Sequence, residues 1–297
     1  MSGKDNTNIL QEIAAYTRGR IEAKKRVAPL EEVRARAESL SRAEHIESAQ
    51  QLSGAEQTGS ARPIRGEKRI GFAESLAAPG VRLICECKKA SPSKGLIAPD
   101  FPYLAIAKDY EAAGAAAISV LTEPNWFLGS DAYLEEIARS VTIPCLRKDF
   151  TVDPYMIYEA KALGASAVLL ICAILSKSQL SEYLALTHEL GMDALVETHS
   201  EEEIRMAAES GARIIGVNNR DLKTFHVDLG NTARLKDLIP EDRIAVSESG
   251  IRTPEDVAAL RGSGIRAALV GEALMRSPDR RQALREFLKG SKEGHHG

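Results

Sequence analysis

The chain has 297 residues and a formal net charge of −3, with 39 Lys and Arg residues against 42 Asp and Glu residues. This near balance gives no general case for nucleic acid or an anionic membrane as a partner, although local sites for small anions stay open. The longest apolar stretch, residues 163–175, is too short to span a bilayer, and the first ten residues lack the apolar core of a signal peptide. We therefore expect a cytoplasmic protein.

Residues 8–50 are rich in Ala, Glu, Arg and Lys, and Ile9, Ile13, Tyr16 and Ile21 recur at roughly helical spacing. This pattern predicts an amphipathic helical extension. The polar stretch 51–68 contains Gly, Ser, Thr and Pro. It suits either a solvated connection or a flap over the mouth of the domain that follows.

A unit of helix, glycine and strand recurs from residue 82 onward. Five apolar runs follow a glycine that fits the left-handed end of a helix, namely Gly114, Gly164, Gly191, Gly211 and Gly264. Asp153–Pro154, Thr253–Pro254 and Ser277–Pro278 place proline in a first helical turn, and Ser200 and Glu203 have the spacing of a capping box.

Eight apolar runs of β type follow one another, near residues 82–88, 115–121, 143–148, 167–171, 193–197, 213–217, 243–247 and 267–270. Their alternation with helices predicts an α/β fold, a (β/α)8 TIM barrel over residues 81–290. Residues 1–80 form its N-terminal helical extension and loop, residues 291–297 form a disordered tail, and the whole is one structural domain. An open doubly wound sheet is the alternative.

The first predicted strand ends abruptly in charge, in the segment LICECKKASPSKG of residues 83–95. On a strand, Ile84, Glu86 and Lys88 share one face. An acid and a base that project together at the end of a buried strand are costly unless they pair or do chemistry. This segment therefore indicates the rim of an active site, followed by a Ser-Pro-Ser-Lys-Gly turn.

Other predicted strands also end in polar or charged residues: Lys148, Glu197, Asn218 and Arg220, and Glu248 with Ser249. Any one of these residues alone is typical of a solvated loop or an ion pair at a barrel mouth. Together, in one site of low dielectric constant, lysines and glutamates shift one another's pKa values and provide proton donors and acceptors near neutral pH. The sequence therefore predicts proton-transfer chemistry.

The last two units carry a phosphate signal, with Ser249–Gly250 after the seventh strand and Gly271–Glu272 after the eighth. Glycine lets backbone N–H groups approach an anion, and these two loops are the usual phosphate site of a barrel. The ligand expected here is a small phosphorylated molecule.

Histidine and cysteine give no metal signal. His199 and His226 lie near strand ends, but no second set of ligands completes a site, so we expect surface or structural roles. Cys85 and Cys87 are two residues apart without a partner pair, which favours packing over zinc; like Cys145 and Cys172 they should stay reduced.

The chain resembles the indole-3-glycerol phosphate synthase family from ILQEIAAYTRGRIEAKK near the N-terminus to GEALMR. The order and spacing of CECKKASPSKG, LRKDF and GVNNRDL carry most of this resemblance; RIGFAESL, LTEPNWFLGS, ALVETH and SESGI add to it. It implies conversion of 1-(2-carboxyphenylamino)-1-deoxyribulose 5-phosphate to indole-3-glycerol phosphate, with loss of carbon dioxide and water and without a cofactor or metal.

The resemblance also implies roles for single residues. Lys148 matches the general acid of ring closure, although Lys88 could supply that proton, hold the substrate carboxylate or contact the phosphate. Glu86 and Glu197 match acid/base carboxylates, for which a lysine pKa lowered toward neutrality and a raised glutamate pKa would suit. The implied substrate contacts are Ser91, Asn218, Arg220 and Glu248, with Ser249, Gly250, Gly271 and Glu272 around the phosphate.

Phe127 and Phe150 either form walls for the aromatic ring or pack structurally. Two other functions stay open: a sibling barrel such as phosphoribosylanthranilate isomerase, and a barrel that binds a sugar phosphate without turnover. We expect a monomer, and association with other enzymes of tryptophan biosynthesis stays open.

Overall fold

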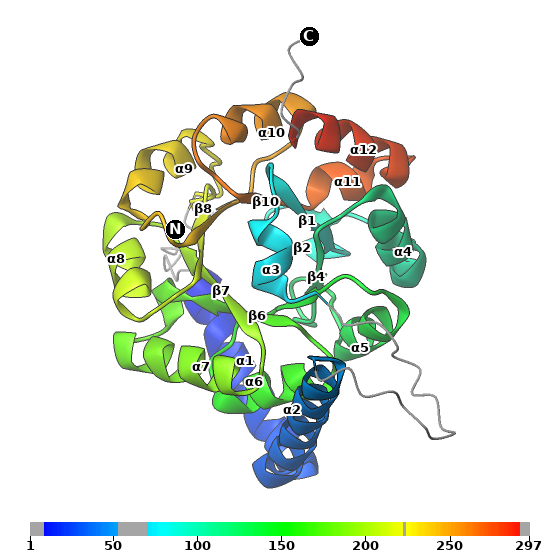
Figure 1. Cartoon of the computed structure of the whole chain (residues 1–297), viewed down its shortest axis with the longest axis vertical. Coiled ribbons are helices and arrows are strands. Elements are labelled where there is room, and N and C mark those ends of the chain that lie inside the picture. Colours follow the sequence, from blue (N-terminus) through cyan, green and yellow to red (C-terminus); the bar gives the residue numbers. More distant parts are fainter. Residues whose placement is uncertain (1–8, 53–69, 222–223, 292–297) are drawn as a thin grey trace, which may run out of the picture.

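The computed structural model describes residues 9–52, 70–221 and 224–291. Eight parallel strands close into a barrel in the order β1-β10-β9-β8-β7-β6-β5-β4, which confirms the predicted fold class (Figure 1). The alternative prediction of an open doubly wound sheet is wrong, because β1 pairs with both β4 and β10 and closes the barrel. The barrel strands are β1 (Arg82–Cys87), β4 (Ala117–Leu121), β5 (Cys145–Lys148), β6 (Ala167–Ile171), β7 (Asp193–Thr198), β8 (Ile214–Asn218), β9 (Ile244–Glu248) and β10 (Ala267–Val270).

Helices surround this barrel, and they bury their apolar faces against the strands (Figure 1). They are α4 (Tyr103–Ala113), α5 (Asp131–Ser140), α6 (Pro154–Ala162), α7 (Lys177–Glu189), α8 (Glu201–Glu209), α9 (Gly230–Leu235), α10 (Pro254–Arg261), α11 (Glu272–Arg276) and α12 (Arg280–Ser291). Two short 3-10 turns, η1 (Cys172–Ile174) and η2 (Lys236–Leu238), follow β6 and α9. In the described residues, no helix is both long and apolar enough to cross a membrane.

Most of the predicted helix boundaries are present. All five of the predicted glycines have positive φ angles. Asp153 and Thr253 cap α6 and α10 through their side chains, with proline in the first turn. The prediction for Ser277–Pro278 is wrong by two residues: α12 begins at Arg280, because the Asp279 carboxylate accepts the Gln282 N–H and takes the capping position.

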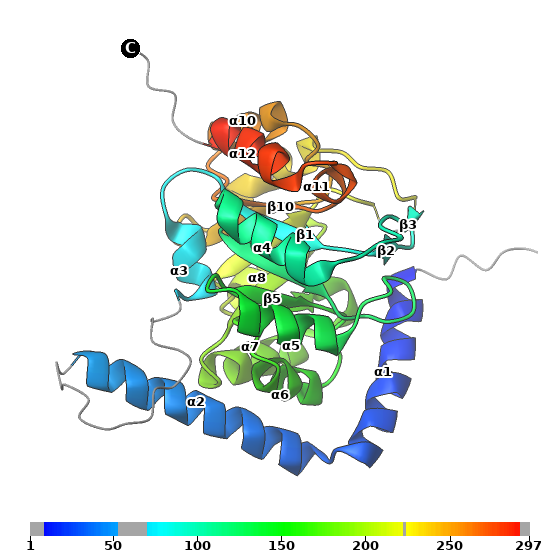
Figure 2. The ribbon, with the colours of Figure 1, turned by 90° about the vertical axis from the view of Figure 1, so that its right-hand side faces the viewer.

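The N-terminal extension is a pair of helices, α1 (Ile9–Val27) and α2 (Leu30–Leu52), rather than one continuous helix. Pro29 lies at the break, directly before α2, where its ring cannot continue α1. A third helix, α3 (Phe72–Ala77), precedes β1. Figure 2 shows α3 at one end of the barrel and α1 beside the other end, where the strands terminate. The sequence analysis did not predict this docking of α1.

The segment after β1 is more ordered than the predicted turn. Ala90–Ser91 (β2) and Gly95–Leu96 (β3) pair antiparallel and form a small hairpin next to the end of α1 (Figure 2). From residue 53 onward the predicted linker 51–68 lies outside the described residues, as does the predicted tail beyond Ser291. The division at residue 80 stays a prediction.

A partly buried set of ion pairs, the α1–β5 network, holds α1 against the barrel. It consists of Arg20, Lys24, Asp131, Arg147, Asp149 and Glu159. Arg147 is only 1% exposed and pairs with Asp131 and Glu159, each at 2.7 Å. Arg20 of α1 donates twice to the Asp149 carboxylate, at 2.9 and 2.8 Å. Each charge in this network has an opposite charge in contact, as buried charges require.

Candidate active site

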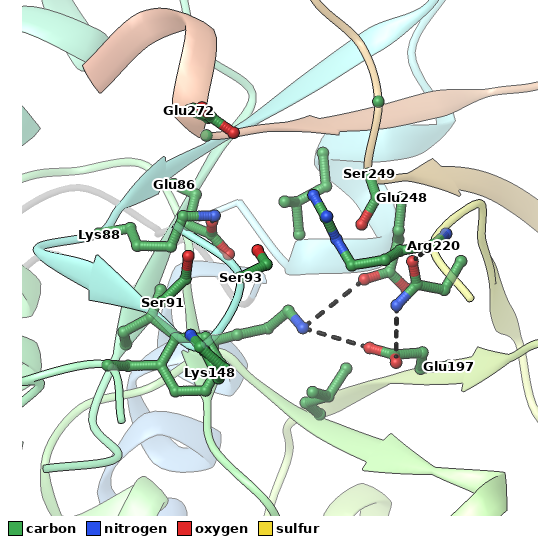
Figure 3. A pocket seen from close by; sticks show the side chains of 18 of the residues that line it. Glu86, Lys88, Ser91, Ser93, Lys148, Glu197, Arg220, Glu248, Ser249 and Glu272 are labelled. Carbon is green, nitrogen blue, oxygen red and sulfur yellow. Dashed lines mark hydrogen bonds and ion pairs between the residues drawn. The ribbon is translucent and has the colours of Figure 1, made fainter. Parts of the chain in front are cut away.

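A cavity of about 460 Å³ opens where the barrel strands end, a size typical of small-molecule sites (Figure 3). All the residues predicted for the site line this one cavity: Glu86, Lys88, Ser91, Phe127, Lys148, Phe150, Glu197, Asn218, Arg220, Glu248, Ser249, Gly250, Gly271 and Glu272. The fold thus brings together residues from seven of the eight strand ends and their loops, up to 186 positions apart in the sequence. The individual roles of these residues stay predictions.

Four ionisable side chains at this mouth come from alternate strands of the barrel, namely Glu86 of β1, Lys148 of β5, Glu197 of β7 and Glu248 of β9. Side chains of alternate strands form one layer of a barrel interior, and such layers are usually apolar. With Lys88, which follows β1, these residues are called the mouth cluster below. A layer of charge in this position is costly to bury, which indicates that it serves the ligand.

Lys148 lies between two carboxylates. Its Nζ is 3.2 Å from Glu197 Oε2 and 3.7 Å from Glu248 Oε2 (Figure 3). Burial opposes the charge of Lys148, but Glu197 and Glu248 outweigh it and raise the lysine pKa above its usual value. Burial also opposes the charge of Glu197, yet Lys148 and then His199 hold its pKa well below the usual range. This pair is therefore ionised, because the neighbouring opposite charges oppose the lowered lysine pKa and the raised glutamate pKa that would suit the chemistry.

The raised glutamate pKa belongs to Glu248. Burial and the neighbouring Glu197 raise the pKa of Glu248 to about 8, so it is mostly protonated at neutral pH. Its carboxyl group packs directly on the backbone of Gly216, where an added Cβ would come within 2.0 Å of Oε1. Only glycine at this position lets the Glu248 carboxyl lie flat against β8.

Glu86 and Lys88 form an ion pair with each other, as their shared strand face predicted. Gly271, after β10, lies against this pair, and an added Cβ would meet Glu86 Oε2 at 2.5 Å and Lys88 Nζ at 3.1 Å. The loop expected to bind phosphate therefore touches the first acid and base of the cluster.

Asn218 fixes the orientation of Glu197. Its Oδ1 accepts the backbone N–H of Arg220 at 3.0 Å, which leaves Nδ2 to donate to Glu197 Oε1 at 2.9 Å. Arg220 donates to the Phe225 carbonyl at 3.3 Å, and its side chain borders the cavity (Figure 3). It lies where it can bind an anionic ligand.

The aromatic side of the cavity is held by a buried carboxylate. Glu123 accepts the backbone N–H groups of Asn125, Trp126 and Phe127 at 2.7–3.0 Å, and this fixes the loop after β4. Phe127 and Phe150 contact each other, with ring centroids 6.1 Å apart, and both border the cavity. They are therefore placed as walls of the cavity and also pack on each other.

At the opposite side, Ser249 and Gly250 have positive φ angles of 65° and 93°. An added Cβ at Gly250 would meet Val227 Cγ1 at 2.6 Å, so the close turn needs glycine for space as well as for conformation. Glu272 is paired with Arg276 at 3.1 Å and with Lys94 at 3.8 Å. This end of the cavity is rich in cations, which suits the predicted phosphate.

Several residues that line the cavity were not predicted, including Leu10 and Ile13 of α1, Leu169 and Ile171 of β6, and Arg252. The alternation of Leu169 and Ile171 in β6 could have identified them, because residues two apart on a barrel strand share a face. Leu10 and Ile13 give no such signal, since nothing local tells where a helical extension docks.

The two histidines near strand ends differ in their surroundings. Both border a second cavity, but His199 also lies against Glu197 and is only 18% exposed. Among the described residues, no group of three or more His, Cys, Asp or Glu side chains could hold a metal ion. A reaction without metal or cofactor stays a prediction.

Comparison with known proteins gives a consistent result. A model of the indole-3-glycerol phosphate synthase family matches residues 39–287. The synthase of Ruminiclostridium cellulolyticum is 50% identical over 283 residues, which are 95% of this chain and 99% of the relative. The synthase of Endomicrobium trichonymphae is 56% identical over 73% of this chain and 84% of its own. A crystal structure of KGPDC from Streptococcus mutans matches with a TM-score of 0.56 and 11% identity, covering 71% of this chain and 97% of that one; it supports the fold alone.

Proposed function

Because the chain belongs to the indole-3-glycerol phosphate synthase family, we propose that its mouth cluster carries out the proton transfers of that reaction. The protein is a decarboxylating lyase of tryptophan biosynthesis. It converts 1-(2-carboxyphenylamino)-1-deoxyribulose 5-phosphate to indole-3-glycerol phosphate, carbon dioxide and water. The match to this family does not favour the sibling isomerase or a barrel without turnover.

Ring closure requires an acid at the ribulose carbonyl. The ring carbon that bears the carboxylate attacks this carbonyl, a carbon–carbon bond forms, and the carbonyl oxygen takes up a proton. We assign this proton to Lys148, which is ionised in the free site and projects into the cavity. The neighbouring Glu197 carboxylate compensates the charge of Lys148 before the transfer. After Glu197 has taken a proton from the substrate in the later step, it can pass that proton to Lys148.

The remaining steps remove carbon dioxide and water. Loss of carbon dioxide leaves its bonding electron pair in the ring. The new hydroxyl then departs as water after protonation, and a base removes the proton that restores the pyrrole ring. The pair of Glu86 and Lys88 supports a second acid and base for dehydration, because it borders the same cavity independently of Lys148. Glu197 is the base assigned to proton removal beside Lys148.

Binding places the substrate between the two sides of the cavity. We assign the phosphate to the backbone of Ser249, Gly250 and Gly271 beside Glu272, and the aromatic ring to Phe127 and Phe150. Ser91, Asn218 and Arg220 then border the sugar and the carboxylate, and Lys88 reaches either the carboxylate or the phosphate. Neutral Glu248 can donate a hydrogen bond that an ionised carboxylate could not.

The observation that carries these assignments is the contact of buried Lys148 with Glu197 inside the ligand cavity. The test is the appearance of indole fluorescence when the carboxyphenylamino-deoxyribulose phosphate is mixed with the wild-type protein and, separately, with Glu197→Gln. Wild-type turnover and a loss of about 10²-fold or more in the variant are expected. Turnover by the variant at the wild-type rate would remove Glu197 from the chemistry, and no turnover by folded wild-type protein would refute the function.

Two further properties belong to the proposal. We place the protein in the cytoplasm, since all four cysteines are buried and none forms a disulfide with another described residue, as suits a reducing compartment. We also propose a monomer, which sedimentation velocity tests directly. A dimer that persists on dilution would contradict it, and co-sedimentation with other enzymes of tryptophan biosynthesis would establish an association.

A further inference from the structure

The Glu197 carboxylate has a second side that the proposed mechanism does not use. His199 is two residues further along the chain, so that its side chain emerges on the same face of the extended backbone as Glu197. Its Nε2 lies 3.3 Å from Glu197 Oε1. This Nε2 is fully covered and makes no hydrogen bond to the described residues, so the Glu197 carboxylate is the anion that faces it.

Glu203 of α8 holds the other side of the imidazole. Its Oε2 accepts the backbone N–H of His199 at 2.7 Å and lies 3.2 Å from His199 Nδ1. The predicted capping box is therefore only half present. Ser200 accepts the Glu203 N–H at 3.3 Å, but the Glu203 carboxylate has turned toward His199 instead of the Ser200 backbone. This departure from a common helix cap gives the imidazole a fixed orientation.

The histidine lies between two cavities. Glu197 borders the candidate active site, whereas His199 and Glu203 border the second cavity. The charged and titratable groups that surround His199 are Glu197, with Lys148 and Glu248 beyond it, Glu203 of α8, and, across the second cavity, Arg220, Asp221, His226, Asp228 and Arg234. The two groups in direct contact with the imidazole are both carboxylates.

These contacts make the two oxygens of Glu197 unequal. Oε1 accepts from Asn218 and faces His199, while Oε2 faces Lys148 and the substrate cavity. Burial favours the neutral imidazole, but Glu197 and Glu203 raise the pKa of His199 to about 10. His199 is then a cation at neutral pH, and it adds a second positive charge beside the Glu197 carboxylate.

We infer that His199, oriented by Glu203, is a positioning residue for Glu197: it fixes the carboxylate so that Oε2 faces the substrate, and it keeps the carboxylate ionised. The inference rests on the proposed function, because it assigns a partner to the base of that reaction. The partly buried His199 thereby places its charge on the side of Glu197 that faces away from the ligand.

The test combines a direct titration with pH profiles. The imidazole signals of isotope-labelled His199 are followed by NMR in the wild type and in Glu203→Gln. We expect a pKa well above the usual value in the wild type and a lower one in the variant, which has lost an anion. A pKa near 6.5 in the wild type would overturn the inference, and this measurement does not depend on turnover.

The pH dependence of kcat/KM is then compared for the wild type, His199→Gln, Glu203→Gln and the matched control His226→Gln, which borders the second cavity without contacting Glu197. Loss of the His199 cation raises the pKa of Glu197, so the acid limb of the His199→Gln profile should move to higher pH, with a loss of about tenfold in kcat/KM at a given pH on that limb. In Glu203→Gln the decline at alkaline pH should begin earlier. The His226→Gln profile should match the wild type.

If the wild type is active and its acid limb coincides with that of His199→Gln, the inference is overturned and the proposed function stays intact. An inactive wild type would refute the proposed function, and the NMR titration would still decide whether the histidine is held as a cation. As a control, circular dichroism and urea unfolding midpoints are measured to check that each variant is folded.

Discussion

Two adjacent residues of β5 belong to two different groups of buried charges. Arg147 points outward into the α1–β5 network, where three cations meet three carboxylates. Lys148 points inward to the mouth cluster, where two lysines meet three carboxylates. The outer group is paired within itself, whereas the inner group reaches balance only because burial and Glu197 keep Glu248 protonated near neutral pH.

This difference separates a structural use of charge from a chemical one. A buried ion pair contributes little net stability, but removing one partner is strongly destabilising because a charge is left without compensation. In the α1–β5 network, moving α1 away would leave Asp149 without Arg20, and this penalty keeps the helix in place. In the mouth cluster the incomplete pairing leaves groups that can take or give a proton.

The largest effect should come from Lys148→Met. We expect kcat to fall by about 10³-fold, because the general acid is lost. The unfolding free energy should fall less than in the Arg147 variant described next. Glu248 is already largely neutral, and Glu197 retains its contacts with Asn218 and His199, so neither carboxyl group is left as an uncompensated charge. Steady-state kinetics and urea unfolding measure both quantities. Near-normal turnover would show that the inner group is structural.

Arg147→Met should do the reverse. The variant leaves Asp131 and Glu159 with only Lys24 as a partner, and we expect the unfolding free energy to fall by about 3 kcal/mol, with kcat of the folded protein close to wild type. Arg139→Met is the matched control, because Arg139 is exposed and pairs with Glu135 on the same helix. Its cost should stay below about 0.5 kcal/mol. Equal costs for the two variants would contradict the assignment.

Arg20→Met tests whether the α1–β5 network affects ligand binding by holding α1 in place. The substitution removes both hydrogen bonds to Asp149, and we expect a cost of about 1–3 kcal/mol in unfolding free energy. Because α1 also carries Leu10 and Ile13 of the cavity wall, KM should rise severalfold while kcat changes less. An unchanged KM would show that the helix stays in place without this pair.

The smallest effect is a pH dependence of stability. Glu248 has a pKa of about 8 when folded against an ordinary value of 4.5, so the folded chain holds an extra proton between these values. Its unfolding free energy therefore falls as pH rises from about 5 to 8. Glu248→Gln cannot ionise, and its stability relative to wild type should improve across that window in urea unfolding. A constant difference between the two proteins would disprove the raised pKa.

The sequence predicted the parts of this comparison that depend on local pattern. Strand ends are visible as apolar runs that stop in charge, and so Glu86, Lys148, Glu197 and Glu248 could be assigned to one barrel mouth. The glycines at helix ends were equally local. The repeated unit then left a closed barrel as the natural arrangement, because eight such units close a parallel sheet.

What the sequence could not supply was the pairing over long distances. Arg147 stood beside Lys148 in the same motif, and only the structure shows that its partners, Asp131 of α5 and Glu159 of α6, lie on helices outside the barrel strands. Pro29 could have indicated the break between α1 and α2, but a helical pattern does not reveal which surface a helix covers. The directions of the pKa shifts depend on distances of 3–4 Å between strands, and His199 had no motif to distinguish it from a surface histidine.

The docking of α1 also has a consequence for the order of events during synthesis. Arg20 leaves the ribosome 129 residues before Asp149, its partner. At about 5–20 residues per second, α1 waits roughly 6 to 26 s before the strand that receives it has been made. During that interval the apolar face with Leu10, Ile13 and Ile21, buried in the finished fold, has no barrel to cover it. Because α1 also packs against η1 (Cys172–Ile174), which follows β6, this face is covered only after β6 has been made.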